Sequence, residues 1–245
     1  KLIENRGWKM LDEFQRIREI YDFVRNEILF GYNVRDDLPA SRVLSDGYGQ
    51  CNTKGTLFMA LLRADGIPCR LHGFTIDKKL QKGAMTGIVY EKAPREILHS
   101  WVEVCFGGKW TELEAFILDE KYLGSLQKKF PDAGAFCGYG AAVKDLQNPA
   151  VEWAGEGTYI QSEGIVRDLG IYSSPDEFYR AHGQASDERQ RKEDPTARIR
   201  YDLRHFFPKN FGTAVKRVDK YRGVWYNIQA FNVKKNFGVI YGCRK

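Results

Sequence analysis

The sequence has no long apolar run. No stretch among its 245 residues approaches the roughly 18 apolar residues that a membrane-spanning helix needs. It also has no C-x-x-C motif, and its cysteines are five in number, which is odd; they stand at positions 51, 69, 105, 137 and 243. These spacings suggest neither a zinc site nor a disulfide framework, so we expect no metal and no cofactor. With 43% hydrophobic and 29% charged residues, the composition fits a soluble protein without a membrane partner.

A cysteine stands where an apolar helix is predicted to begin. Turn-rich residues end at Gln50, and residues 52–64 are apolar almost all round until Gly66 and Pro68 end the helix. Cys51 is therefore predicted at the N-cap or in the first turn. Unpaired backbone N–H groups and the helix dipole there favour a thiolate, and the same N–H groups could hold an oxyanion. The alternative is a small buried core cysteine, since most unpaired cysteines are of that kind.

A β-hairpin is predicted from residue 99 to residue 114. Residues 99–106 alternate in the pattern of a strand, with β-branched and aromatic side chains. Gly107-Gly108 predicts a tight turn, after which residues 109–114 return antiparallel.

The hairpin register brings a carboxylate towards a histidine. With a two-residue turn, facing residues have numbers that sum to 215, so His99 faces Phe116 and Glu114 faces Trp101. Glu114 and His99 are then diagonal neighbours on one face, with Cβ atoms about 5–8 Å apart. Glu114 can bond one ring nitrogen and fix the tautomer of the imidazole. Glu112, on the same face, is the competing carboxylate, and a solvated edge position is the alternative for Glu114.

Three blocks of the sequence, in their order and spacing, resemble the transglutaminase-like superfamily. The blocks are Gly49-Gln50-Cys51, Leu61-Leu62-Arg63-Ala64-Asp65-Gly66-Ile67-Pro68-Cys69-Arg70, and His99-Ser100-Trp101-Val102-Glu103-Val104 with Gly108-Lys109-Trp110. The lead-in segment at residues 20–28 is also similar, so the resemblance covers roughly residues 8–120. It implies an α+β, papain-like fold in which the nucleophile helix packs on an antiparallel sheet.

The resemblance also implies a catalytic triad, with Cys51 as nucleophile, His99 as base and Glu114 as third member. The family more often has aspartate followed by proline at the third position, where this sequence has Glu114-Ala115, and often an acidic residue in place of Asn52. The N–H of Cys51 is expected to supply one oxyanion donor. The candidates for the second donor are Tyr48, Gln50 and Tyr32.

The reaction implied is acyl transfer through a thioester on Cys51, with a peptide or small amide as substrate. Water as acceptor gives a peptidase or amidase, which we favour because no residue pattern marks an amine site. An amine acceptor gives a transglutaminase or an arylamine acetyltransferase-like enzyme. The latter usually carries arginine-glycine-glycine before its cysteine, where this sequence has Tyr48-Gly49-Gln50. A non-catalytic binding module of the same fold is the third alternative.

Further features of the sequence narrow the class of protein and its expected location. The large animal transglutaminases add β-domains and calcium sites, for which 245 residues leave no room, and no acidic calcium loop is present. Because a nucleophilic cysteine must stay reduced, we expect a cytoplasmic protein. No signal peptide is recognised, and the first residue is Lys1, which leaves a removed leader open.

Other elements are predicted from periodicity and turn residues. They are one amphipathic helix over 8–30, a strand over 69–76, an element at 84–91, a helix from after 119 to about 128, glycine-rich loops over 130–160, and a short helix from 175 to 183 capped by Ser174. His182 and His205 have no partners at ligand spacing, so we expect surface or capping roles for them.

The C-terminal end of the chain is basic. Residues 189–245 contain 15 Lys and Arg against 4 Asp and Glu, a net +11, whereas the whole chain is +6. They also contain ten aromatic residues. We therefore predict a catalytic domain at 1–185 and a basic, aromatic extension at 186–245 that packs on it. Nucleic-acid binding through the extension is the less favoured alternative, because no nucleic-acid motif is present.

Removing the extension tests its packing. Truncation at about Ser186 should give an insoluble or unfolded protein, because ten aromatic side chains are too many to leave in water. Solubility and thermal unfolding of the truncated chain measure this. A soluble truncated protein with unchanged heat stability would refute the prediction and direct attention to salt-sensitive binding by the basic segment.

Overall fold

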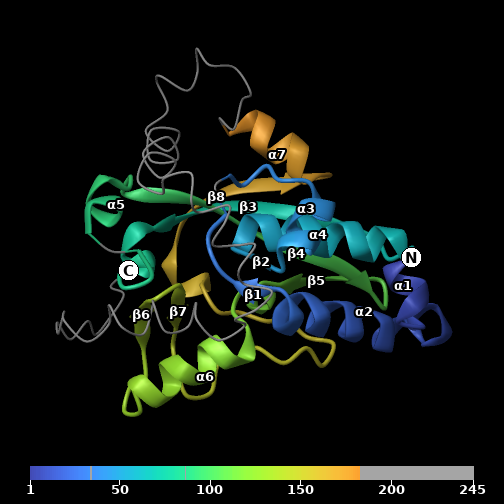
Figure 1. Cartoon of the computed structure of the whole chain (residues 1–245), viewed down its shortest axis with the longest axis horizontal. Coiled ribbons are helices and arrows are strands. Elements are labelled where there is room, and N and C mark those ends of the chain that lie inside the picture. Colours follow the sequence, from blue (N-terminus) through green and yellow to red (C-terminus); the bar gives the residue numbers. More distant parts are fainter. Residues whose placement is uncertain (34, 86, 183–245) are drawn as a thin grey trace.

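The protein is centred on a four-stranded sheet with helices packed against it (Figure 1). The structure, a computed structural model, describes residues 1–33, 35–85 and 87–182. The sheet has the order β5-β4-β3-β8, and all its neighbouring strands are antiparallel. Its strands are β3 (Cys69–Asp77), β4 (Glu96–Phe106), β5 (Lys109–Leu113) and β8 (Ile165–Tyr172). This combination of helices and antiparallel sheet confirms the predicted α+β class.

Two short strand pairs lie outside the main sheet. They are the parallel pair β1 (Leu29–Phe30) and β2 (Tyr48–Gly49), and the antiparallel pair β6 (Phe136–Gly138) and β7 (Ala141–Val143). The second pair lies within the segment predicted to be loops only, so that prediction was incomplete. Short strands separated by glycines give little periodicity from which to recognise them.

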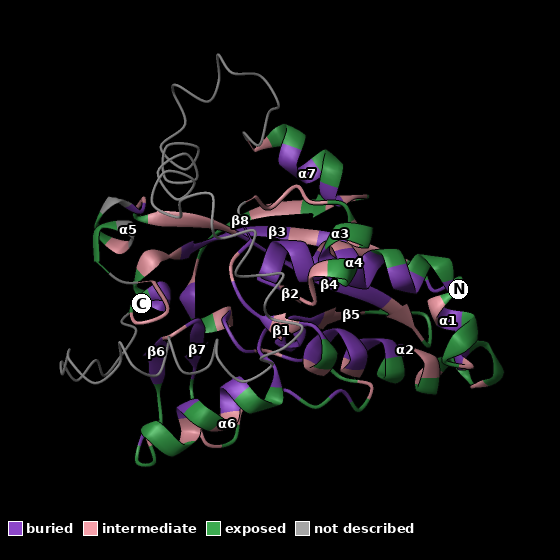
Figure 2. Ribbon diagram, viewed as in Figure 1, coloured by how far each residue is buried: buried purple, intermediate pink, exposed green. Residues whose placement is uncertain are grey.

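The α-helices are α1 (Leu2–Asn5), α2 (Glu13–Asp22), α3 (Ala40–Asp46), α4 (Cys51–Ala64), α5 (Gly87–Lys92), α6 (Glu120–Lys129) and α7 (Pro175–Ala181). Single turns of 3-10 helix are η1 (Trp8–Met10), η3 (Lys78–Gln81), η4 (Ala115–Ile117) and η5 (Ser162–Gly164), and η2 (Phe23–Glu27) is a π-helical turn. α4 packs against β4 and β3, while α7 packs against β3 and β8. Figure 2 shows α4 as one of the most buried helices, with α6 and α7 exposed along their outer faces. No helix among the described residues combines the length and apolarity needed to cross a bilayer.

The N-terminal helix differs from its prediction. One helix over residues 8–30 was expected, but the structure has η1, α2 and the π turn η2 instead. The break falls where Asp12 forms a capping box with Gln15 and starts a new helix. The apolar stripe itself was read correctly in large part, since Ile17, Ile20 and Val24 are fully buried.

The hairpin prediction is confirmed over five residue pairs. Phe106 faces Lys109 across Gly107-Gly108, and the pairing continues to Val102 opposite Leu113. Both glycines have positive φ, 56° and 76°, as a two-residue hairpin turn requires. The ladder then ends, so the pairs expected beyond Leu113 do not form.

The remaining predictions are mostly confirmed. The strand at 69–76, the helix at 52–64, the helix after 119 and the short helix after Ser174 appear as β3, α4, α6 and α7. Ser174 caps α7 through the N–H of Glu177, and His182 is its C-cap residue. β8, for which no prediction was made, completes the sheet. The extension at 186–245, with His205 and Cys243, lies outside the described residues, and its packing stays a prediction.

A fully buried lysine joins α4 to two other segments. The Lys54 Nζ donates to the backbone carbonyls of Arg25, in the π turn, at 3.2 Å and of Ile117, in η4, at 3.0 Å. A π turn displaces the regular backbone hydrogen bonds of a helix, and this side chain takes up one of its carbonyls. Burial lowers the pKa of Lys54 to about 7, although the nearby charge of Asp119 opposes that shift.

This pKa predicts a pH-dependent stability difference between the wild type and Lys54→Met. Between about pH 7 and the ordinary pKa of 10.5, the unfolded chain holds a proton on Lys54 that the folded chain has lost. Stability of the wild type relative to the variant should therefore rise with pH in this window, by at most about 1.4 kcal/mol per pH unit. Chemical denaturation at several pH values measures the difference. The exposed Lys121→Met is the control, and a difference that stays flat with pH for Lys54→Met would contradict the prediction.

Candidate functional site

Cys51 is the first residue of α4, as predicted from the turn before it. Gln50 is the N-cap residue, and its side chain and that of Thr53 form a capping box. Gly49 precedes them in a space that admits no side chain, since an added Cβ would lie 2.6 Å from the Thr53 Oγ1. Cys51 is 6% exposed, and the N–H groups of this first turn have no acceptor within the helix.

His99 and Glu114 are in direct contact and both fully buried. The His99 Nε2 lies 2.8 Å from the Glu114 Oε1, which accepts its hydrogen bond. The predicted contact is thus present, although its geometry differs from the predicted ladder. Glu114 has left the strand, with φ −115° and ψ −35°, and begins η4. It therefore faces neither Trp101 nor any other residue in a β pair.

The second oxygen of Glu114 is held by backbone. Its Oε2 accepts from the N–H groups of Ile160 at 2.8 Å, Gln161 at 2.8 Å and Ser162 at 3.0 Å. Hydrogen bonds to a buried carboxylate are charge-assisted and stronger than neutral ones. The longer arm of glutamate reaches both this N–H cluster and His99. The cluster was missed by the sequence analysis, because backbone donors 46 to 48 residues away leave no signal in side-chain patterns.

His99 also interacts with Cys51. Burial of the ring works against its charged form, but hydrogen-bonding and charge interactions with Cys51, and then with Glu114, outweigh burial and raise the pKa of His99 to about 9. Its Nδ1 is buried without a well-formed hydrogen bond to any described residue. The His99 ring thus interacts with both Cys51 and Glu114, and the hydrogen bond to Glu114 fixes its Nε2.

The three oxyanion candidates differ in their surroundings. The Gln50 Oε1 accepts from the Asn33 N–H at 2.8 Å and its Nε2 donates to Asp36 at 2.6 Å, so this amide joins the start of α4 to the loop before α3. Burial raises the pKa of Tyr48, and its charged neighbours are Asp46 and Arg42 of α3. Burial raises the pKa of Tyr32 well above its ordinary value, with Tyr122 and Cys51 adding to the shift, and its hydroxyl donates to Gln81.

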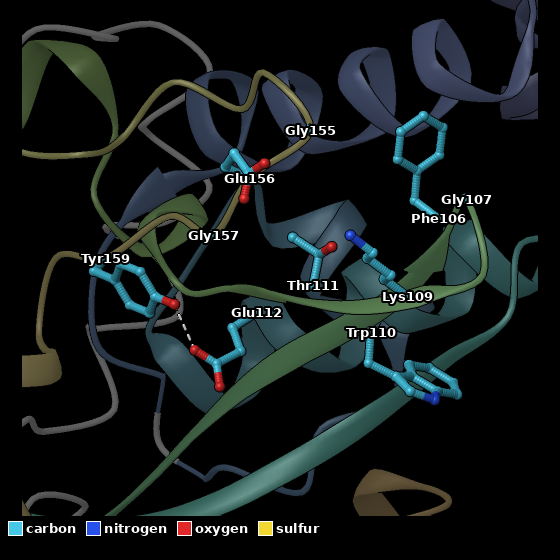
Figure 3. A pocket seen from close by; sticks show the side chains of 10 residues that line it. All are labelled: Phe106, Gly107, Lys109, Trp110, Thr111, Glu112, Gly155, Glu156, Gly157 and Tyr159. Atoms are coloured by element: carbon cyan, nitrogen blue, oxygen red, sulfur yellow. Dashed lines mark hydrogen bonds between the residues drawn. The ribbon is translucent and has the colours of Figure 1, made fainter.

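Glu112, the competing carboxylate, points elsewhere. It accepts a hydrogen bond from the Tyr159 hydroxyl and lines a hollow of about 420 Å³ at the hairpin end of β5 (Figure 3). Glu156, Lys109 and Trp110 also line this hollow, whereas the Cys51–His99–Glu114 group is absent from its wall. Glu114, not Glu112, is therefore the carboxylate that contacts His99.

Among the described residues, Cys51, Cys69, Cys105 and Cys137 form no disulfide. The Cys69 Sγ lies 3.7 Å from the Met59 carbonyl oxygen, and burial raises the pKa of Cys69. Within the part of the chain that the structure describes, no group of three or more His, Cys, Asp or Glu residues could hold a metal ion.

The comparison with family models agrees with the sequence motif. Residues 6–115, which include Cys51, His99 and Glu114, match the family model described as the transglutaminase-like superfamily. No curated protein matches the chain. A solved structure from Cytophaga hutchinsonii, named a "Putative Cysteine Protease", matches with 15% identity and a TM-score of 0.36. The match covers 66% of this chain and 37% of that one, so this chain spans well under half the length of that structure.

The site geometry predicts the alkylation behaviour of Cys51. Cys51 stands at a helix N-terminus, a position that favours thiol reactivity, and its neighbour His99 has a pKa raised to about 9. Iodoacetamide at pH 6.5 should therefore modify Cys51 well before Cys69, Cys105 or Cys137. Peptide mapping by mass spectrometry measures the order and the rates.

Two variants separate the carboxylates in the same assay. Glu114→Gln removes the charge that supports the imidazolium, so alkylation of Cys51 at pH 6.5 should slow by about tenfold or more. Glu112→Gln should leave the rate unchanged. Equal labelling of all cysteines in the folded protein, or equal effects of the two variants, would exclude this role for the His99–Glu114 pair.

Proposed function

We propose that residues 6–115, which match the model of the transglutaminase-like superfamily, form a domain of that superfamily, and that the chain is a cysteine hydrolase that cleaves an amide bond through a thioester on Cys51. The observation that carries the proposal is the buried hydrogen bond between His99 and Glu114 beside a cysteine at a helix N-terminus. A structural cysteine would need neither a histidine of raised pKa nor a carboxylate to orient it.

In the first half of the reaction, the Cys51 Sγ attacks the carbonyl carbon of a peptide or small amide substrate. The carbonyl electron pair moves to oxygen, and the negative charge is met by the N–H of Cys51 at the start of α4. The tetrahedral intermediate then collapses, the C–N bond breaks, and the His99 imidazolium gives its proton to the leaving amine. The thioester and a neutral imidazole remain.

In the second half, neutral His99 takes a proton from water, and the resulting hydroxide attacks the thioester carbonyl. The C–S bond breaks, the acid leaves, and the thiolate–imidazolium pair returns. The role of Glu114 is to orient His99 and to stabilise the positive charge on the ring. Tyr32 is our candidate for the second oxyanion donor; to act, its hydroxyl must exchange Gln81 for the substrate oxygen.

An activated ester tests the chemistry without knowledge of the natural substrate. With p-nitrophenyl acetate, we expect a burst of p-nitrophenolate and an acetyl group on Cys51 in the intact mass. Cys51→Ser should abolish both, and His99→Gln should slow acetylation by about 100-fold or more. Glu112→Gln serves as the control with wild-type behaviour.

The fate of the acetyl group distinguishes the alternatives. Release as acetate that is unaffected by added glycinamide supports a hydrolase, whereas acetylglycinamide as the main product would make the protein an amine-accepting acyltransferase. Failure of Cys51 to acetylate faster than Cys69 or Cys105 would leave a non-catalytic module of this fold and overturn the proposal.

A further inference from the structure

The residue after the nucleophile uses both ends of its side chain. The Asn52 Nδ2 donates to the backbone carbonyl of Leu98 at 3.3 Å, and its Oδ1 accepts from the Ser100 hydroxyl at 2.9 Å. Asn52 and Ser100 are both buried, at 1% and 0% exposure. Leu98 and Ser100 are the two neighbours of His99 in the chain. The side chain of Asn52, the residue after Cys51, therefore contacts the residues on both sides of His99.

The early end of β5 explains why the Leu98 carbonyl can accept a hydrogen bond from Asn52. Phe106 and Lys109 close a two-residue hairpin, so even-numbered residues of β4 direct their peptide groups towards β5. The β5 ladder ends opposite Val102, which leaves the Leu98 carbonyl beyond it on that side. A buried carbonyl without a partner is costly, and the Asn52 amide satisfies this one.

The Asn52 hydrogen bonds link α4 to the part of β4 that no longer pairs with β5. β4 near His99 pairs with β3 on one side, where His99 faces Phe74. On the other side β5 has ended, and the Asn52 side chain of α4 donates to the β4 backbone where a neighbouring strand would otherwise donate. Movement of α4 along β4 would break both Asn52 hydrogen bonds, and the same movement would change the separation of Cys51 and His99.

We propose that Asn52 and Ser100 are positioning residues that fix the Cys51 sulfur against the His99 ring. This inference rests on the proposed function, because it assigns the two residues to the thiolate–imidazolium pair. Asparagine suits the position since one side chain must both donate, to a carbonyl, and accept, from a hydroxyl. Aspartate could accept from Ser100, but it could not donate to Leu98 and would place a negative charge beside the thiolate.

The test compares the pH profiles of Cys51 alkylation by iodoacetamide in Asn52→Asp, Ser100→Ala and the wild type. In Ser100→Ala, the Asn52 amide keeps its hydrogen bond to the Leu98 carbonyl, so we expect the fold to be retained. Asn52 loses its second hydrogen bond, the one from the Ser100 hydroxyl. The measured quantity is the rate of Cys51 alkylation at pH 6.5 divided by the rate at pH 9.5. We expect this ratio to fall about threefold to tenfold in Ser100→Ala and further in Asn52→Asp.

Two controls separate positioning from general stability. Ser125→Ala removes an exposed hydroxyl that donates to the Lys121 carbonyl and should leave the profile unchanged. Leu126→Ala removes buried side-chain atoms from α6, away from the site, and should lower the unfolding temperature without moving the pH profile.

The outcomes are distinct. If wild-type Cys51 shows no enhanced reactivity at pH 6.5, the proposed function fails. If it does, and Ser100→Ala keeps the wild-type profile while folded by circular dichroism, the positioning role is overturned and the proposed function stands. A profile displaced equally by Leu126→Ala would also overturn it, because general loosening would then suffice.

Discussion

The buried Glu114 carboxylate is the constraint on which the site depends. Removing a carboxylate from water is costly unless its oxygens are paired. Here one oxygen has the His99 ring and the other has three backbone N–H groups. These partners satisfy both oxygens of the carboxylate inside the protein, and the same carboxylate fixes the orientation of the His99 ring.

The same buried region explains how α4 is held so firmly. Its first turn carries a sequence of polar side chains, each directed at a different segment. Asn52 contacts β4, Thr53 donates to Asn33 at 2.6 Å in the loop before α3, and Lys54 contacts the π turn and η4. A helix attached in three directions has little freedom to shift, which is the preorganisation that catalytic geometry needs.

The sequence predicted the elements of the site better than their connections. The turn before Cys51, the strand pattern at His99 and the two-glycine hairpin each depend on local residue types, so α4, β4 and the register as far as Leu113 were predictable. The exit of Glu114 from the ladder was not, because its backbone N–H donates to the carbonyl of Thr158, a residue distant in the sequence. Similarly, the break at Asp12 depends on a cap that competes with a continuous apolar stripe. The chemistry inferred for Cys51, His99 and Glu114 stays a prediction.

The distance along the chain between Glu114 and its N–H donors has a consequence for how the protein matures. All three proposed catalytic side chains lie within the first 114 residues, yet the donors at residues 160–162 are synthesised later. Until they arrive, the carboxylate has no backbone to hold it and His99 has no fixed partner. The three side chains would therefore reach their final arrangement only after residues 160–162 have been made and have folded against Glu114.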